Sequence, residues 1–126
     1  MERNVPRADG TYIRRETIAS QAFWDLNGVA IKVFMVFRLK CRIVKTSAGK
    51  KEIKNILNNG EIIFTFQEAW KKYGVPKSTF LRARDQLIKV GLIEIEDDGG
   101  CHHTTKYAIS DNWRNYPEQT FERSKS

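Results

Sequence analysis

Apolar residues recur at spacings of three and four over residues 20–40, and this pattern predicts a first helix. Ser20 is placed to cap its start. The row consists of Phe23, Leu26, Ala30, Val33, Phe34 and Phe37. A second side of the segment is also apolar, through Ala22, Val29, Met35 and Val36. Such a helix either threads the core or packs on another subunit.

Residues 45–60, KTSAGKKEIKNILNNG, have only a weak apolar pattern. Their glycines, asparagines and four lysines are typical of a surface connection between elements. We therefore predict a mobile loop here and assign it no chemistry.

The run EIIFTF, residues 61–66, is rich in β-branched and aromatic residues and predicts a short strand. Thr65 and Glu68 have the spacing of a capping box, so the strand should pass directly into a second helix over residues 67–73. That helix should bury Ala69 and either Trp70 or Tyr73. Gly74 should end it in a left-handed conformation, and Pro76 prevents its continuation.

A third helix is predicted over residues 79–90, with Ser78 as its cap and Gly91 at its end. Its apolar stripe consists of Phe80, Ala83, Leu87 and Val90. After it, LIEIE alternates, DDGG supplies a turn and TTKYAIS returns as a partner strand. The register of this hairpin should be fixed by Ile93, Ile95, Tyr107 and Ile109.

The ends of the chain have a different character. Residues 1–17 hold four arginines together with Pro6 and Gly10, which indicates a flexible basic arm. Residues 18–116 form the single domain that the length of the chain allows, and residues 117–126 form a tail. Near the end of the domain, Ser110 should cap a short turn in which Trp113 covers the domain edge and Arg114 is exposed.

Composition narrows the choice of partner. The chain has 126 residues, with 22 Lys and Arg against 15 Asp and Glu, a net charge of +7 and a pI near 9.6. A basic balance favours polyanions such as nucleic acid. The beginning, MERNVPRADG, has no apolar signal-peptide region, and the most apolar run, VAIKVFMVF, is too short to span a bilayer. We expect a cytoplasmic protein that does not enter membranes.

The predicted order is helix, strand, helix, turn, helix, hairpin. Over about residues 61–109 the sequence EAWKKYGVPKSTFLRARDQLIKVGLIEIE, followed by KYAIS, resembles winged helix-turn-helix domains of small bacterial, phage and plasmid regulators and replication-type proteins. The resemblance implies an α+β, mainly α fold, with a three-helix core, a β-hairpin wing and here an N-terminal basic arm. It also implies binding to double-stranded DNA.

In such a fold the recognition helix, about residues 78–90, lies in the major groove, and its first turn reaches the bases first. The outward residues are Lys77, Ser78, Thr79, Arg82, Gln86 and Lys89. Arg82 suits guanine and Gln86 suits adenine, whereas the lysines suit phosphate. Ser78 is also the expected cap. The competing interpretation is a solvated surface helix in which Arg82 pairs with Asp85.

A wing supplies a second contact, usually through basic residues at its tip. Here Asp97 and Asp98 depart from that pattern, although His102, His103 and Lys106 on the returning side remain within reach of DNA. Wing contact should therefore be weaker than helix contact.

The sequence offers little for metal binding or catalysis. Adjacent residues of a strand point to opposite faces, so Cys101, His102 and His103 do not converge on one ion, and Cys41 lies far away in the sequence. No nucleophile elbow or phosphate-cradling loop is present in the sequence. We expect no enzyme activity, no cofactor, no metal and no small-molecule substrate.

These patterns predict a sequence-selective double-stranded DNA-binding protein, either a prokaryotic transcriptional regulator or a replication-associated factor of a mobile element. The second apolar side of the first helix and the small footprint of one recognition helix favour a homodimer. The alternative is a winged-helix protein–protein adaptor that uses the first helix and Trp113 as its apolar surface.

Overall fold

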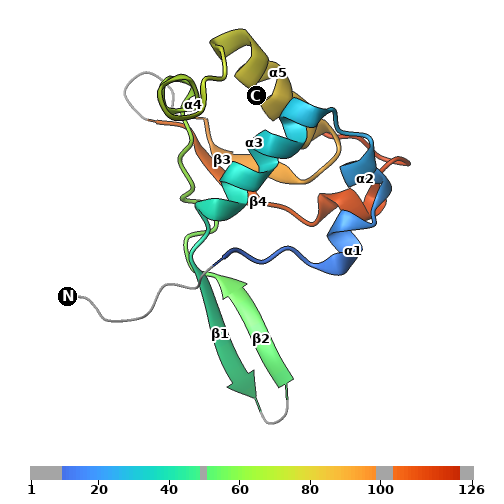
Figure 1. The fold of residues 1–126 in the computed structure, drawn as a ribbon. Coiled ribbons are helices and arrows are strands. Elements are labelled where there is room, and N and C mark those ends of the chain that lie inside the picture. Colours follow the sequence, from blue (N-terminus) through green and yellow to red (C-terminus); the bar gives the residue numbers. More distant parts are fainter. Residues whose placement is uncertain (1–9, 49–50, 99–103, 123–126) are drawn as a thin grey trace, which may run out of the picture.

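The computed structural model describes residues 10–48, 51–98 and 104–122. Within these ranges the fold is α+β and mainly helical, with two antiparallel two-stranded sheets (Figure 1). The elements are α1 (Arg15–Ile18), α2 (Gln21–Trp24), α3 (Gly28–Leu39), β1 (Ile43–Ala48), β2 (Lys51–Ile56), α4 (Phe66–Tyr73), α5 (Lys77–Lys89), β3 (Ile93–Asp97), β4 (Lys106–Ile109) and the 3₁₀ helix η1 (Asn112–Asn115). No helix in these ranges is long and apolar enough to cross a bilayer.

The apolar row predicted as one helix over residues 20–40 is divided between α2 and α3. Ser20 caps α2 as predicted, because its side chain accepts a hydrogen bond from the Phe23 amide at 3.2 Å. Asn27 starts α3 in the same way, accepting from the Ala30 amide at 2.8 Å. The prediction of one helix was wrong because the apolar spacing continues across the break, where Leu26 is buried.

The predicted caps are correct for α4 but not for the start of α5. Thr65 accepts from the Glu68 amide at 3.1 Å, and Gly74 ends α4 with a φ of 69°, the left-handed region that favours glycine. However, α5 begins at Lys77 with Pro76 at its N-cap, two residues before the predicted start. Ser78 therefore lies inside the helix and is not its cap.

The β3–β4 hairpin has the predicted register. Ile93 pairs with Ile109 and Ile95 with Tyr107, with an irregularity before Asp97. The strand predicted over residues 61–66 shrinks to one bridge between Ile62 and Tyr107. It ends there because Phe64 is buried in the core and Thr65 already caps α4.

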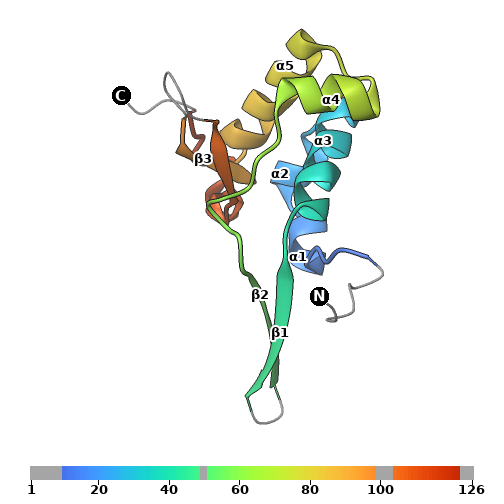
Figure 2. The same cartoon turned by 90° about the vertical axis from the view of Figure 1, so that its left-hand side faces the viewer.

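The segment predicted as a mobile loop forms a second hairpin, β1–β2. Its register runs from the pair Ile43–Ile56 to the pair Ala48–Lys51. At its base the Leu57 amide donates to the Arg42 carbonyl at 2.8 Å. The hairpin projects from the helical body (Figures 1 and 2). The prediction of an irregular connection was wrong here.

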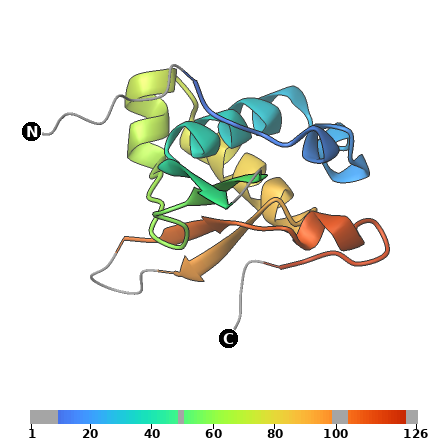
Figure 3. The ribbon, with the colours of Figure 1, turned by 90° about the horizontal axis from the view of Figure 1, so that it is seen from below.

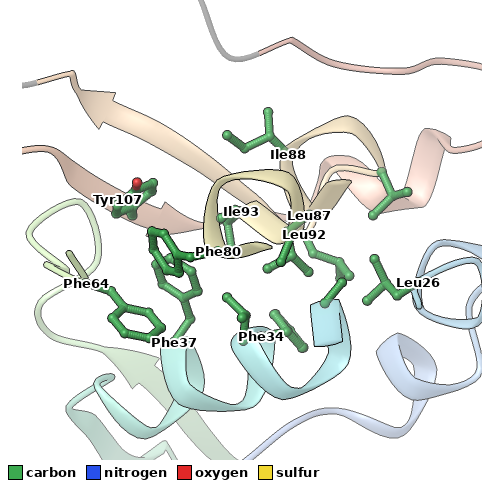
Figure 4. Packing of buried hydrophobic residues seen from close by; sticks show 14 of the residues in the cluster. Leu26, Phe34, Phe37, Phe64, Phe80, Leu87, Ile88, Leu92, Ile93 and Tyr107 are labelled. Atoms are coloured by element: carbon green, nitrogen blue, oxygen red, sulfur yellow. The ribbon is translucent and has the colours of Figure 1, made fainter. Parts of the chain in front are cut away.

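The core lies between α3, α5 and the β3–β4 hairpin (Figure 4). Phe37 is its centre: its ring contacts those of Phe64 and Tyr107 edge to face, at centroid distances of 5.2 and 5.0 Å. Phe80 of α5 contacts Phe64 at 5.0 Å. Burial of each such side chain contributes about 1.5–3 kcal/mol, so this aromatic cluster fixes α3 and α5 against each other.

Residues 11–17 pack on the domain, although the basic arm was expected to extend to residue 17 (Figure 3). The Thr11 hydroxyl donates to the Arg38 carbonyl at 2.9 Å, and Thr17 is buried. Arg114 of η1 donates to both carboxylate oxygens of Glu16, at 3.2 and 2.8 Å. This described part belongs to the domain, while residues 1–9 lie outside the described residues.

The C-terminal segment closes the domain. Trp113 is buried in η1, and the Arg114 guanidinium lies 4.5 Å from its ring centroid. The Tyr116 hydroxyl donates to Asp25 at 2.6 Å, and this bond, followed by one from Gln21, lowers the pKa of Asp25. The predicted turn after Ser110 is confirmed, because the Ser110 hydroxyl oxygen accepts from the Asn112 amide at 3.0 Å. The predicted tail from residue 117 is in part attached to the domain, because the amide of residue 121 donates to the carbonyl of residue 89 at 3.1 Å.

Candidate nucleic-acid interface

One exposed row runs the length of α5. Its members, spaced by four, three and four residues on one side of the helix, are Ser78, Arg82, Asp85 and Lys89. The opposite side, with Phe80, Ala83 and Leu87, is buried in the core. Packing against α3 therefore turns this polar row outward.

Arg82 has no hydrogen-bond or ion-pair partner among the described residues, and its side chain is exposed. The pair with Asp85, expected if the helix were an ordinary solvated one, does not form. Asp85 is instead bound by Arg84, whose Nη2 lies 3.0 Å from Asp85 Oδ1. The guanidinium of Arg82 is thus available to a ligand.

Arg84 neutralises the acidic member of the row. Desolvation is the largest single influence on this guanidinium and opposes its charge, but contacts with Tyr107 and Asp85 together raise the pKa of Arg84. Its side chain is only 12% exposed, so it lies under the row and not on it. The negative charge of Asp85 is therefore compensated from within the fold.

Lys77 opens α5 and is held in place by α4. Its ammonium nitrogen lies 4.3 Å from the ring centroid of Phe66, a cation–π contact. Lys71 and Lys72 are exposed on the same α4 helix. The nearby Glu68 is engaged by Lys40, which binds both of its oxygens at 2.8 and 2.7 Å, so most of its charge is already balanced.

Two aromatic side chains lie beside these cations. Trp70 is 60% exposed and Tyr73 46% exposed, whereas one of them was predicted to be buried with Ala69. Ala69 alone fills that core position. The α4 surface is therefore both cationic and aromatic, a feature that the apolar pattern of a short helix did not indicate.

Gln86 belongs to the fold and not to the exposed row. Its side-chain oxygen accepts from the Asn27 amide at 3.0 Å and so fixes the link between α2 and α3 to α5. Thr79 is half-buried. Base recognition by Gln86 stays a prediction and would require its side chain to leave this hydrogen bond, whereas Ser78, Arg82 and Lys89 are exposed.

The wing is acidic. Exposed carboxylates lie on β3 and directly after it, at Glu94, Glu96, Asp97 and Asp98. Lys106, predicted to contact DNA, forms an ion pair with Glu61 at 3.1 Å. His103 lies outside the described residues, as do Cys101 and His102. Within the described part of the β3–β4 hairpin, the positive charge of Lys106 is outweighed by these four carboxylates.

No match to this chain was found among protein-family models, curated proteins or solved structures. In the residues that the structure describes, no group of three or more His, Cys, Asp and Glu side chains has the arrangement of a metal site. The candidate interface therefore rests on the geometry and charge of α4 and α5.

Proposed function

We propose that this chain is a sequence-selective double-stranded DNA-binding protein that inserts α5 into the major groove. The observation that carries the proposal is Arg82, an exposed guanidinium in the middle of the outward row of α5, without a partner in the described structure while neighbouring Asp85 is already paired.

The chemistry of this surface suits duplex DNA. A major groove about 12 Å wide admits one helix, and an arginine there binds guanine O6 and N7 in a bidentate manner. Lys71, Lys72 and Lys77 lie beside the start of α5, where phosphates flank an inserted helix. Arg82 would then select the base, and the lysines would supply general affinity.

The winged helix-turn-helix interpretation is part of the proposal. It is supported by the order of the elements along the chain, which is α3, α4, the left-handed Gly74, α5 and the β3–β4 hairpin. The acidic wing departs from that family's usual basic tip, so the wing contributes little binding energy. The role in the cell would be that of a prokaryotic transcriptional regulator or a replication-associated factor of a mobile element, without catalysis.

A homodimer is proposed because one recognition helix covers only one half-site, and two helices about 34–36 Å apart would read successive turns of the duplex. Most of the second apolar side of the first helix packs inward, however, since Ala22 is buried and Val29 and Val36 are half-buried. Met35 and Leu39 remain exposed on α3 as the surface for a second copy.

The adaptor alternative has less support. It requires Trp113 as an apolar surface, and this side chain is buried under Arg114. Trp24 of α2, together with Met35 and Leu39 of α3, remains exposed for such a partner.

The test is a selection of bound duplexes from random sequence, made with the full chain at two salt concentrations. Arg82→Ala should cost about 1–3 kcal/mol and relax preference at one base pair, whereas Lys77→Ala should weaken all sequences and reduce the salt slope by about one. Arg15→Ala, which removes an equal charge from exposed α1, is the matched control. The absence of enrichment, together with no binding of random duplex at low salt, would refute the proposal.

A further inference from the structure

A cavity of about 300 Å³ lies on the side of the core away from the start of α5. It is partly open to solvent and is lined by α3, the segment before α1, the base of the β1–β2 hairpin, and the end of β4 with η1. This volume is at the lower end of those that hold small molecules.

The polar side chains buried in the described structure converge on this cavity. Thr17 and Arg38 are each 8% exposed and Ser110 is 6% exposed, and they are the three buried polar residues of the described chain. All three line the cavity, although they come from α1, α3 and the end of β4. Packing of the core does not explain why three polar side chains meet at one cavity, since buried polar groups are costly unless they are paired.

Arg38 is the least satisfied of the three. Its Nη2 donates to the Tyr12 carbonyl, but its buried Nε has no hydrogen-bond partner. Burial lowers the pKa of Arg38, yet a guanidinium remains charged in a folded protein. No described carboxylate forms an ion pair with it, and a buried charge without a counter-ion is strongly unfavourable. The site therefore lacks an anion.

The groups around Arg38 also leave room for an anionic partner, because they offer free hydrogen-bond donors and no net negative charge. The Ser110 hydroxyl oxygen accepts from the Asn112 amide, while its proton has no acceptor among the described residues. The Thr17 hydroxyl likewise makes no hydrogen bond to a described residue. Of the exposed charged groups that line the cavity, Arg14 adds a positive charge and Asp111 a negative one, so the two offset each other and Arg38 sets the sign.

Apolar side chains form the smaller part of the wall. Phe34 of α3, Leu92 after α5 and Trp113 of η1 line the cavity and are buried. The amide of Asn59, which also lines it, is engaged with the backbone of Ile109, at 3.1 and 2.7 Å, and so frames the wall. A ligand would need one anionic end for Arg38 and a small apolar body for these three side chains.

We propose that this cavity binds a small organic anion, whose carboxylate or phosphate accepts hydrogen bonds from Arg38, Thr17 and Ser110 while its apolar body packs on Phe34, Leu92 and Trp113. Both acid groups present the paired oxygens that a guanidinium recognises. Binding at this site requires nothing of α5 and does not depend on DNA binding.

The experiment titrates the full chain with benzoate and with phenyl phosphate, followed by ¹H–¹⁵N NMR, with benzamide as the uncharged analogue. The amide of Ser110 and the indole of Trp113 should shift and saturate with at least one of the two anions. Which anion binds more tightly decides between carboxylate and phosphate. Benzamide should bind at least tenfold more weakly, because it lacks the charge that Arg38 attracts.

Variants separate this site from adventitious binding. Arg38→Met should weaken binding at least tenfold and raise the melting temperature of the ligand-free protein, because it removes an unpaired buried charge. Ser110→Ala, which keeps the charge, should weaken binding severalfold, and Arg82→Gln outside the cavity should not change it. Equal binding by Arg38→Met and the unmodified chain, equal binding of benzamide and benzoate, or no shift of Ser110 and Trp113 with either anion would overturn the proposal.

Discussion

The two β-hairpins of this chain differ in how they contact the hydrophobic core. The β3–β4 hairpin contributes Ile93 and Tyr107 to the core, and its alternate side chains Ile95 and Ile109 pack against that core. The β1–β2 side chains that the structure describes are those of Ile43, Asn55 and Ile56, and none of them belongs to the core cluster. One hairpin is therefore part of the folded body, and the other extends from it (Figure 2).

Their charges also differ. Residues 43–56 contain four lysines and one glutamate, whereas residues 93–109 contain four acidic residues and one lysine. A hairpin that is buried along one face has its register set by the core, so its exposed positions are free to vary in charge. If α5 binds DNA as we propose, a hairpin beside it need not carry the basic charge of a DNA-binding wing.

The largest expected effect distinguishes the hairpins by stability. Tyr107→Ala should lower the free energy of unfolding by about 3–5 kcal/mol, because it removes a buried ring that contacts Phe37. Urea denaturation measures the change. Leu57→Ala, at an exposed position after β2, is the control and should cost less than about 0.5 kcal/mol. Similar losses of stability at both positions would show that the two hairpins do not differ in their contribution to the fold.

A smaller effect concerns the acidic β3–β4 hairpin, the wing of the proposed function. Combined Glu94→Gln and Glu96→Gln should raise affinity for duplex DNA about threefold at low ionic strength, because two exposed like charges no longer repel phosphates. The gain should vanish at high salt, as measured by fluorescence anisotropy. The pair Glu118→Gln and Glu122→Gln changes the net charge equally in the C-terminal segment. If this control pair has the same effect, only total charge matters and the wing has no special position.

The smallest expected effect follows from removing the projecting hairpin. Replacement of residues 45–54 by Asn-Gly keeps the pairs Ile43–Ile56 and Val44–Asn55 at its base. The free energy of unfolding should change by less than about 1 kcal/mol, because a two-stranded hairpin is only marginally stable by itself. Thermal and urea unfolding measure it. A full-length variant with Lys45, Lys51 and Lys54 changed to Gln separates the loss of charge from the loss of strands. A cost of several kcal/mol would make β1–β2 part of the folded body.

The sequence was sufficient for the β3–β4 hairpin, where alternating apolar residues face the core. The register of β3–β4 followed from Ile93, Ile95, Tyr107 and Ile109, because those side chains have only one buried face available. The β1–β2 hairpin was missed because its lysine-rich sequence has no strong alternation of apolar and polar residues. The break in the first helix was missed because Leu26 keeps the apolar period while Asn27 starts a new cap.

The candidate site was less predictable because long-range contacts decide which polar residues are free. Arg82 is exposed as its spacing indicated, but Gln86 is bound by the amide of Asn27, 59 residues away. No local pattern reveals such a bond. The position of Arg38 near a helix end likewise predicts a solvated side chain. It is buried because the segment around Tyr12 and the end of β4 cover it.

The contacts around η1 join parts of the chain that are synthesised at different times. Arg114 binds Glu16 from 98 residues away, and Tyr116 binds Asp25 from 91 residues away. At about 5–20 residues per second, Glu16 and Asp25 are synthesised about 5–20 s before these partners. During that interval the two carboxylates lack the hydrogen bonds that attach them to the end of the folded domain.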